Sequence, residues 1–235
     1  MISTSALRGF FVSAVSRCSC AFVLSAPVLF MSLHVSAGMI DKNGMKAWEI
    51  CGLCHGADGN SYMSKFPKLA GQKPAYIKQQ FLAFRNSERE NDGGQMQAIT
   101  TEVELSQLDD ISEYFFTQAQ PKPVEISAQE SRQSLENLRI GKNVYERGRE
   151  GVLACVGCHS DKDSTAPWLD AQHADYLKKQ LRDFDSGKRK TEIEVHAEYG
   201  AKEFTGLPLG EAGKLTEGEI DSLSTYLASL RLTRQ

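Results

Sequence analysis

The pentapeptide Cys51-Gly52-Leu53-Cys54-His55 is repeated as Cys155-Val156-Gly157-Cys158-His159, 104 residues further along the chain. Two cysteines three positions apart, followed at once by a histidine, form the signature for covalent attachment of a c-type haem. The two thiols become thioether links to the porphyrin, and the histidine ligates the iron. Two copies therefore predict two covalently bound haem c groups. The predicted attachment residues are Cys51, Cys54, Cys155 and Cys158, and the predicted iron ligands are His55 and His159.

Paired cysteines have two other common roles, and both fit this sequence less well. A Cys-x-x-Cys pair can hold a structural zinc ion, or it can act as a thioredoxin-like redox dithiol. A zinc site would not require a histidine directly after both pairs. A redox dithiol is normally found near a strand, helix, strand pattern, and neither pair has one around it. The repeated histidine therefore favours haem.

The first 37 residues have the pattern of a cleaved signal peptide. Residues 1–37 contain two arginines and no acidic residue, run apolar from 20 to 35, and end in Val35-Ser36-Ala37. A retained membrane anchor is the alternative, but Pro27 and His34 interrupt the apolar run, which falls short of the ~20 clean apolar residues that a membrane span needs. We therefore expect cleavage after residue 37, a periplasmic protein and no permanent membrane anchor.

Export has consequences for the cysteines and for the charge of the mature chain. Cys18 and Cys20 would leave with the signal peptide, so that all four remaining cysteines belong to the haem motifs and none is left for a disulfide. Loss of two arginines lowers the formal net charge from −3 to −5. This negative charge argues against binding to nucleic acid or to anionic membrane surfaces, and it favours a redox partner with a basic docking patch.

Two small domains are expected after the signal peptide. The stretch 121–133 is polar and contains Pro121 and Pro123, which disfavour helix and mark a linker. We therefore predict a first domain at 38–120 and a second at 134–235, called the first and second halves below. Each half is small, and a buried haem would supply much of the apolar surface that so short a chain lacks.

An internal repeat relates the two halves. From Pro67 onward they align without a gap at an offset of 100 residues. Carried forward, this register places Met96 opposite His196. The aligned pairs include Pro67 and Pro167, Leu69 and Leu169, Gln72 and Gln172, Tyr76 and Tyr176, Gln80 and Gln180, and Arg89 and Arg189.

The expected fold class is all-α. Helices are predicted at Gly44–Ile50 and Gly141–Arg147, before the motifs, and at Tyr76–Phe84 and Tyr176–Phe184, after them. Both halves close with apolar positions spaced three and four apart, which indicates a helix that buries one face. These positions are Leu105, Leu108, Ile111 and Phe115, and Ile220, Leu223, Leu227 and Leu230. No alternating apolar run is long enough for a sheet.

The chain resembles the dihaem periplasmic cytochromes c of the cytochrome c4 type. Besides the paired motifs, the similar segments are Cys54–Asn60, Phe66–Gln72 and Gly187–Arg189, and the resemblance covers nearly all of the mature chain. It implies two tandem class I cytochrome c domains, each wrapped around one covalent haem. It also implies that the carbonyls of Pro67 and Pro167 orient the two iron-binding histidines.

The resemblance implies a methionine as the sixth iron ligand, in the loop after the middle helix, and Met96 stands there in the first half. A loop methionine can also serve only in packing, but Met63 lies just eight residues past His55 and competes poorly. No methionine follows Met96, so the register points to His196 for the second haem. Imidazole is a stronger donor than thioether and lowers the potential. The alternatives are an open site beside a loop histidine and, more remotely, ligation by Lys202.

Two further residues of the second half receive structural interpretations. His173 corresponds to Lys73 in the register, and we interpret it as a loop or surface residue. Trp168 follows Pro167 directly, and we expect it to pack beside the second haem.

These features predict a periplasmic electron carrier. It would pass single electrons from a quinol-oxidising complex or a dehydrogenase to an acceptor such as a terminal oxidase. The alternative is a haem redox enzyme, or the cytochrome subunit of a dehydrogenase such as a sulfide-oxidising flavoprotein, with an open or labile site at the second haem. No separate acid/base constellation clusters around His159 in the sequence, which favours the carrier over the enzyme.

Overall fold

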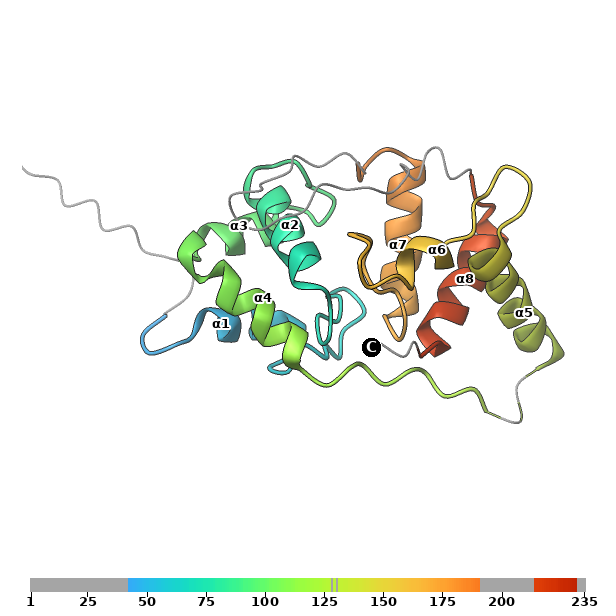
Figure 1. Cartoon of the computed structure of the whole chain (residues 1–235), viewed down its shortest axis with the longest axis horizontal. Helices are drawn as coiled ribbons and strands as arrows, with labels where there is room; N and C mark the ends of the chain where they lie inside the picture. The colour runs from blue at the N-terminus through green and yellow to red at the C-terminus, as the bar shows by residue number, and fades with distance from the viewer. Residues whose placement is uncertain (1–41, 128, 130, 191–213, 232–235) are drawn as a thin grey trace, which may run out of the picture. The chain divides into compact units, whose positions relative to one another are not determined.

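Helices form the regular structure of the part of the chain that this computed structural model describes, which is residues 42–127, 129, 131–190 and 214–231 (Figure 1). No strand occurs within these residues, so the predicted all-α class is confirmed. The helices are α1 (Ala47–His55), α2 (Pro74–Arg85), α3 (Gln95–Thr101), the 3₁₀ turn η1 (Leu105–Gln107), α4 (Leu108–Thr117), α5 (Arg132–Arg147), α6 (Val156–His159), α7 (Ala174–Asp185) and α8 (Glu217–Ser229). The predicted signal peptide, residues 1–37, lies outside the described residues.

The middle helices reproduce the predicted register. α2 and α7 begin and end at positions that are 100 residues apart. Pro74 opens α2, where its missing N–H costs nothing because the first turn has no partner for that group. Ile77 and Leu177 are buried at matching positions of the two helices. The repeat in the sequence is therefore also a repeat in the structure.

The helices that lead to the motifs differ from the predicted ranges. α1 begins at Ala47 rather than Gly44 and continues through the motif to His55, so one helix carries all three haem-binding residues of the first half. α5 begins much earlier than predicted, inside the expected linker. Ser131 caps it by accepting a hydrogen bond from the N–H of Ser134.

α5 stops at Gly148, which has a φ of 64°. A Cβ there would lie 2.2 Å from the carbonyl oxygen of Val152, so only glycine fits this turn. The chain then turns between Arg149 and Val152, where the two backbones exchange hydrogen bonds of 2.8 Å. The second motif consequently lies on a separate short helix, α6, whereas the first lies on α1.

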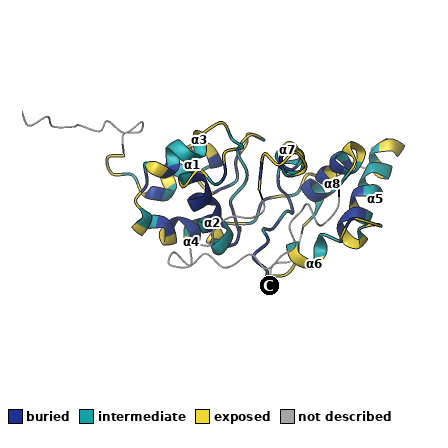
Figure 2. Ribbon diagram, turned by 90° about the horizontal axis from the view of Figure 1, so that it is seen from above, coloured by how far each residue is buried: buried dark blue, intermediate teal, exposed yellow. Residues whose placement is uncertain are grey.

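Two hydrophobic clusters form the core, one from each half, and both contain buried ribbon segments in Figure 2. In the first cluster α1 packs on α4, and in the second α5 packs on α8. Phe115 is fully buried and Leu227 is 1% exposed. Burial of a side chain of this size stabilises the fold by about 1.5–3 kcal/mol. The predicted apolar faces of the last helix in each half, α4 and α8, thus pack against the first helix of that half, α1 and α5.

α5 and α8 lie close together at Gly141. A Cβ on this glycine would lie 2.2 Å from the carbonyl oxygen of Ser222 and 2.7 Å from Cβ of Tyr226. Glycine therefore lets the two helix backbones come together. The stretch that precedes α5 has no helix, and the N–H of Val124 donates to the carbonyl of Ala228 at 2.8 Å. The domain boundaries inside this stretch stay a prediction.

Candidate functional site

The first motif lies on the last two turns of α1. Cys54 lies three residues and His55 four residues after Cys51, so each of these two side chains lies one helical turn along from Cys51. His55 is 5% exposed, and its Nδ1 donates to the carbonyl of Pro67 at 2.8 Å. Because a carbonyl can only accept, the hydrogen is on Nδ1 and the lone pair is on Nε2. This is the tautomer that an iron ligand requires.

The second motif repeats this arrangement on α6. Nδ1 of His159 donates to the carbonyl of Pro167 at 2.7 Å. The histidine and the proline are 8 residues apart here, against 12 in the first half. The same hydrogen bond therefore forms across connecting segments of different length. This agreement supports the predicted role of both prolines in holding the histidine rings.

Burial keeps both histidines neutral. It lowers the pKa of His55, and it lowers the pKa of His159 to about 4, while the hydrogen bonds to the proline carbonyls act in the opposite direction. Neutral imidazole is the form that ligates metal. None of the four motif cysteines is in a disulfide, so all four are available for attachment. Two thiols beside one neutral imidazole match the donor set of a covalently bound haem c in each half.

Of the two predicted sixth ligands, Met96 lies among the described residues and His196 does not. Met96 is the second residue of α3 and is half-buried, and its N–H donates to the carboxylate of Asp92, which holds the first turn of the helix. Met63, its competitor in the sequence, is 58% exposed. His196 and Lys202 lie outside the described residues. Ligation by Met96 and by His196 therefore stays a prediction.

Two glutamines, which the sequence marks only as aligned positions, connect the two halves. Gln72 donates from Nε2 to the carbonyl of Trp168 at 3.0 Å and accepts from the N–H of the same residue at 3.0 Å. Gln172 does the same to Lys68, with distances of 3.0 and 2.9 Å. Lys68 and Trp168 are themselves 100 residues apart. Each half thus holds the backbone of the other by an equivalent pair of hydrogen bonds.

A second contact between the halves is built around two buried arginines. Its members are Arg89, Arg189, Gln80, Gln180, Tyr76 and Tyr176, which we call the arginine cluster. Arg89 reaches the second half by donating to Gln180 at 2.9 Å and to Tyr176 at 3.2 Å. Arg189 reaches the first half by donating to Tyr76 at 3.0 Å. Although burial alone would raise the pKa of Tyr176, the positive charges of the two arginines lower it.

His173 lies in a loop, as interpreted, but it is not a surface residue. His173 precedes α7, and its Nε2 donates to the carbonyl of Ser61 at 3.0 Å, in the other half of the chain. The residue is half-buried rather than exposed. Trp168 is 8% exposed, and its packing beside the second haem stays a prediction. The sequence carried a partial signal for the contacts between the halves, since the two glutamines and the two arginines are aligned pairs of the repeat.

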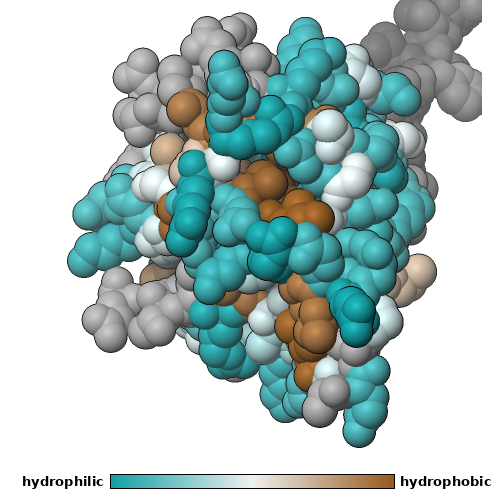
Figure 3. All heavy atoms as spheres, turned by 90° about the vertical axis from the view of Figure 1, so that its right-hand side faces the viewer, coloured by the Kyte–Doolittle hydropathy of each residue, from teal (hydrophilic) through white to brown (hydrophobic). Residues whose placement is uncertain are grey.

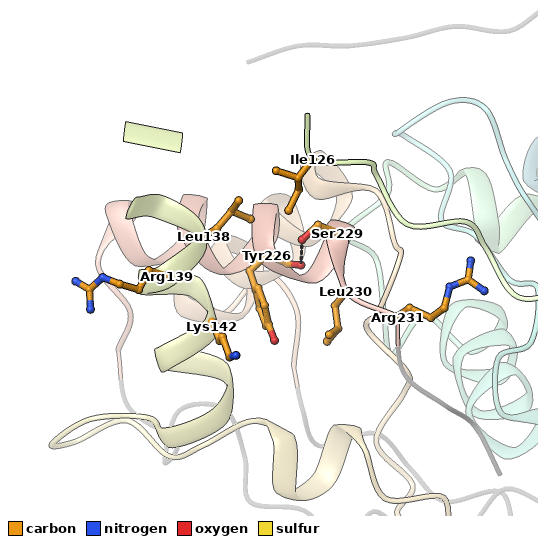
Figure 4. A pocket seen from close by; sticks show the side chains of 8 residues that line it. All are labelled: Ile126, Leu138, Arg139, Lys142, Tyr226, Ser229, Leu230 and Arg231. Carbon is orange, nitrogen blue, oxygen red and sulfur yellow. Dashed lines mark hydrogen bonds between the residues drawn. The ribbon is translucent and has the colours of Figure 1, made fainter. Parts of the chain in front are cut away.

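A separate groove lies on the face that carries α5 and α8, where apolar side chains form a stripe between hydrophilic ones (Figure 3). It has a volume of about 420 Å³, and Figure 4 shows its lining side chains, which come from the linker, α5, α8 and the two residues after α8. They are Ile126, Leu138, Arg139, Lys142, Tyr226, Ser229, Leu230 and Arg231. The lining contains no motif residue, so this groove is distinct from the haem-binding residues.

Two further findings concern the described part of the chain alone. Within it, no group of three or more His, Cys, Asp or Glu side chains is arranged to hold a metal ion, as a zinc site would require. None of the helices described is long and apolar enough to cross a membrane.

Comparison with known proteins identifies the family. The sequence model of cytochrome c matches residues 138–231. Cytochrome c4 of Pseudomonas aeruginosa is 34% identical over 188 residues, which are 77% of this chain and 84% of that protein. Cytochrome c4 of Thiocapsa roseopersicina is 33% identical over 193 residues, which cover 79% of this chain and 89% of the relative.

A solved structure has the same fold. The crystal structure of reduced recombinant cytochrome c4 from Pseudomonas stutzeri superposes with a TM-score of 0.62 at 27% sequence identity, covering 79% of this chain and 97% of the other. Sequence similarity, fold and the paired motifs thus agree. The chain belongs to the cytochrome c4 family, whose members are all-α dihaem proteins with class I cytochrome c folds and covalently bound haem.

Proposed function

We propose that this protein is a periplasmic electron carrier, which passes single electrons from a quinol-oxidising complex or a dehydrogenase to an acceptor such as a terminal oxidase. Membership of the cytochrome c4 family supports electron transfer by two haem groups. The observation that carries the proposal is the repeated pairing of a buried, neutral histidine with a proline carbonyl, in His55 with Pro67 and in His159 with Pro167.

In this proposal the motif residues position the cofactors. Each haem, when bound, supplies one-electron chemistry between ferric and ferrous iron. The thiols of Cys51, Cys54, Cys155 and Cys158 attach the two groups. His55 and His159 present Nε2 to the irons, and the proline carbonyls fix the ring tautomer and raise the donor strength of the imidazoles.

The sixth ligands give the transfer a direction. Met96 is the proposed ligand in the first half, and its neutral thioether stabilises ferrous iron and raises the potential. His196 is the proposed ligand in the second half, where imidazole stabilises ferric iron and lowers the potential. Electrons that enter at the second half would therefore pass downhill to the first.

The charge and the export signal define the setting. After removal of residues 1–37 the chain has a formal net charge of −5. An acidic carrier binds best to partners with a basic patch around their own redox centre, because opposite potentials steer the encounter. We therefore propose redox proteins of the periplasm or of the periplasmic face of the membrane as partners.

The spin state of each iron tests this proposal. Paramagnetic resonance and optical spectra would be recorded for the wild type, for His196→Ala and for Lys202→Ala, all matured with haem. Two low-spin haems in the wild type, one of which becomes high-spin in His196→Ala and not in Lys202→Ala, are expected for the carrier. One high-spin haem in the wild type that takes up carbon monoxide or peroxide would instead favour the redox enzyme or the dehydrogenase subunit.

A further inference from the structure

Residues 73 and 173 occupy equivalent positions in the repeat, and they bridge the two halves in opposite directions. Lys73 precedes α2, and His173 precedes α7. Nζ of Lys73 donates to the carbonyl of Asp161 at 2.6 Å, and Nε2 of His173 donates to the carbonyl of Ser61 at 3.0 Å. The two acceptors are also 100 residues apart. The contact is therefore symmetrical in its geometry and unsymmetrical in its chemistry.

The segment that Lys73 reaches is the one that supports the second iron-binding histidine. It connects His159 with Pro167, whose carbonyl holds the imidazole ring. Lys73 also donates to the carbonyl of Ser164, at 2.7 Å, in the same segment. Its ammonium lies 4.1 Å from the ring centroid of Trp168, the residue after Pro167. These two carbonyls and the aromatic ring thus fix the position of this cation.

The two bridging side chains differ in charge at neutral pH. Lys73 is 8% exposed, so solvent does little to screen its charge. Burial, together with the charge of Lys68, lowers the pKa of His173. The second half thus receives a fixed positive charge where the first half receives a neutral imidazole.

We propose that Lys73, a residue of the first half, raises the reduction potential of the haem attached to Cys155 and Cys158 in the second half. A positive charge favours ferrous over ferric iron, because the reduced site carries one positive charge less. Imidazole ligation by His196 would lower the potential of the second haem, and the charge of Lys73 opposes that change. Lys73 therefore narrows the difference in potential between the two haems. This inference depends on the proposed function, in which His159 is an iron ligand.

The expected size of the effect follows from Coulomb's law. At an effective dielectric constant of about 20, one unit charge acting across roughly 12 Å changes a one-electron equilibrium about tenfold, or about 59 mV. We expect loss of the charge to shift the reduction equilibrium of the second haem towards the ferric form by about threefold to tenfold. The first haem should shift much less.

Three variants of the full-length, haem-containing protein separate charge from hydrogen bonding. Lys73→Gln keeps a donor for the carbonyls of Asp161 and Ser164 but removes the charge, and Lys73→Arg keeps both. His173→Lys places the charge in the opposite half. Redox titrations at neutral pH, with the two haems distinguished by their paramagnetic resonance signals, give the potential of each haem.

A lowered potential of the second haem in Lys73→Gln, a near wild-type value in Lys73→Arg, and a raised potential of the first haem in His173→Lys are expected. Equal shifts in the glutamine and arginine variants, or no shift in either, would overturn the inference. If Lys73→Gln does not incorporate haem, the test rests on His173→Lys alone. An unchanged potential of the first haem in that variant would refute the electrostatic role. Failure of the proposed function itself is recognised separately, by a high-spin haem in the wild type.

Discussion

Truncation of Gln72 tests the contact between the two halves most directly. The side chain is 7% exposed and exchanges two hydrogen bonds with the backbone of Trp168, and its oxygen also accepts from the N–H of Lys73 at 3.0 Å. Gln72→Ala removes all three bonds in a place where water has little access. A hydrogen bond makes a net contribution of about 0.5–1.5 kcal/mol to stability, so we expect the loss of three to cost about 2–4 kcal/mol.

The measurement is unfolding of the haem-containing protein by guanidinium chloride, followed by circular dichroism. Gln133→Ala is the matched control, because Gln133 is exposed on α5 and donates from its side chain only to Asn137 on the same helix. That variant should change the free energy of unfolding by less than about 0.5 kcal/mol. A loss below about 1 kcal/mol in Gln72→Ala, or one no larger than in the control, would refute the reasoning.

The double variant shows whether the two glutamines hold one contact. Gln172→Ala should also destabilise, since it removes the bonds to Lys68. If both glutamines hold the same contact between the halves, the second truncation costs less once the first has been made. Strict additivity of the two free-energy changes would mean that each glutamine acts only on its own local segment.

Three further variants test the site and the packing. Met96→Ala should lower the potential of one haem in a redox titration. A shift in the potentials of both haems, or of neither, would contradict the two-domain assignment. Gly141→Ala should cost about 1–3 kcal/mol in thermal unfolding because its Cβ meets the backbone of α8, whereas Gly218→Ala, with open space around it, should not destabilise. Hydrogen bonds from Arg149 lower the pKa of Glu219 to about 2. This stabilisation, about 1 kcal/mol after solvent screening, is complete above about pH 4.3 and is lost as the pH falls towards 2, so the stability curves of Glu219→Gln and the wild type should converge there; a gap independent of pH would contradict this.

The features that the sequence predicted correctly are local or repeated ones. The haem motifs are five-residue patterns, and their chemistry follows from residue types at fixed spacing. The middle helices α2 and α7 were predicted to within two residues at either end, because their apolar positions recur at helical spacing in both halves. The pairing of each motif histidine with a proline carbonyl followed from the family resemblance.

Helix ends were predicted less well, because they depend on neighbours that lie beyond the hydrophobic pattern. α5 extends back to Arg132 because Ser131 caps it. Leu135 and Leu138 stand at helical spacing ahead of the predicted range, so the sequence did carry a signal for the longer helix. The turn at Gly148 separates the second motif from α5, whereas α1 continues through the first motif. Both outcomes depend on local backbone conformation at single residues.

The sequence by itself determined the family, the two covalent haem sites and the register of the repeat, because covalent attachment and helical periodicity depend on residues close together in the chain. Only the tertiary structure decided how the halves meet. Gln72, Arg89 and His173 each bond to residues about a hundred positions away. Their partners are brought within hydrogen-bond distance by folding, so no local pattern could distinguish these three side chains from surface residues.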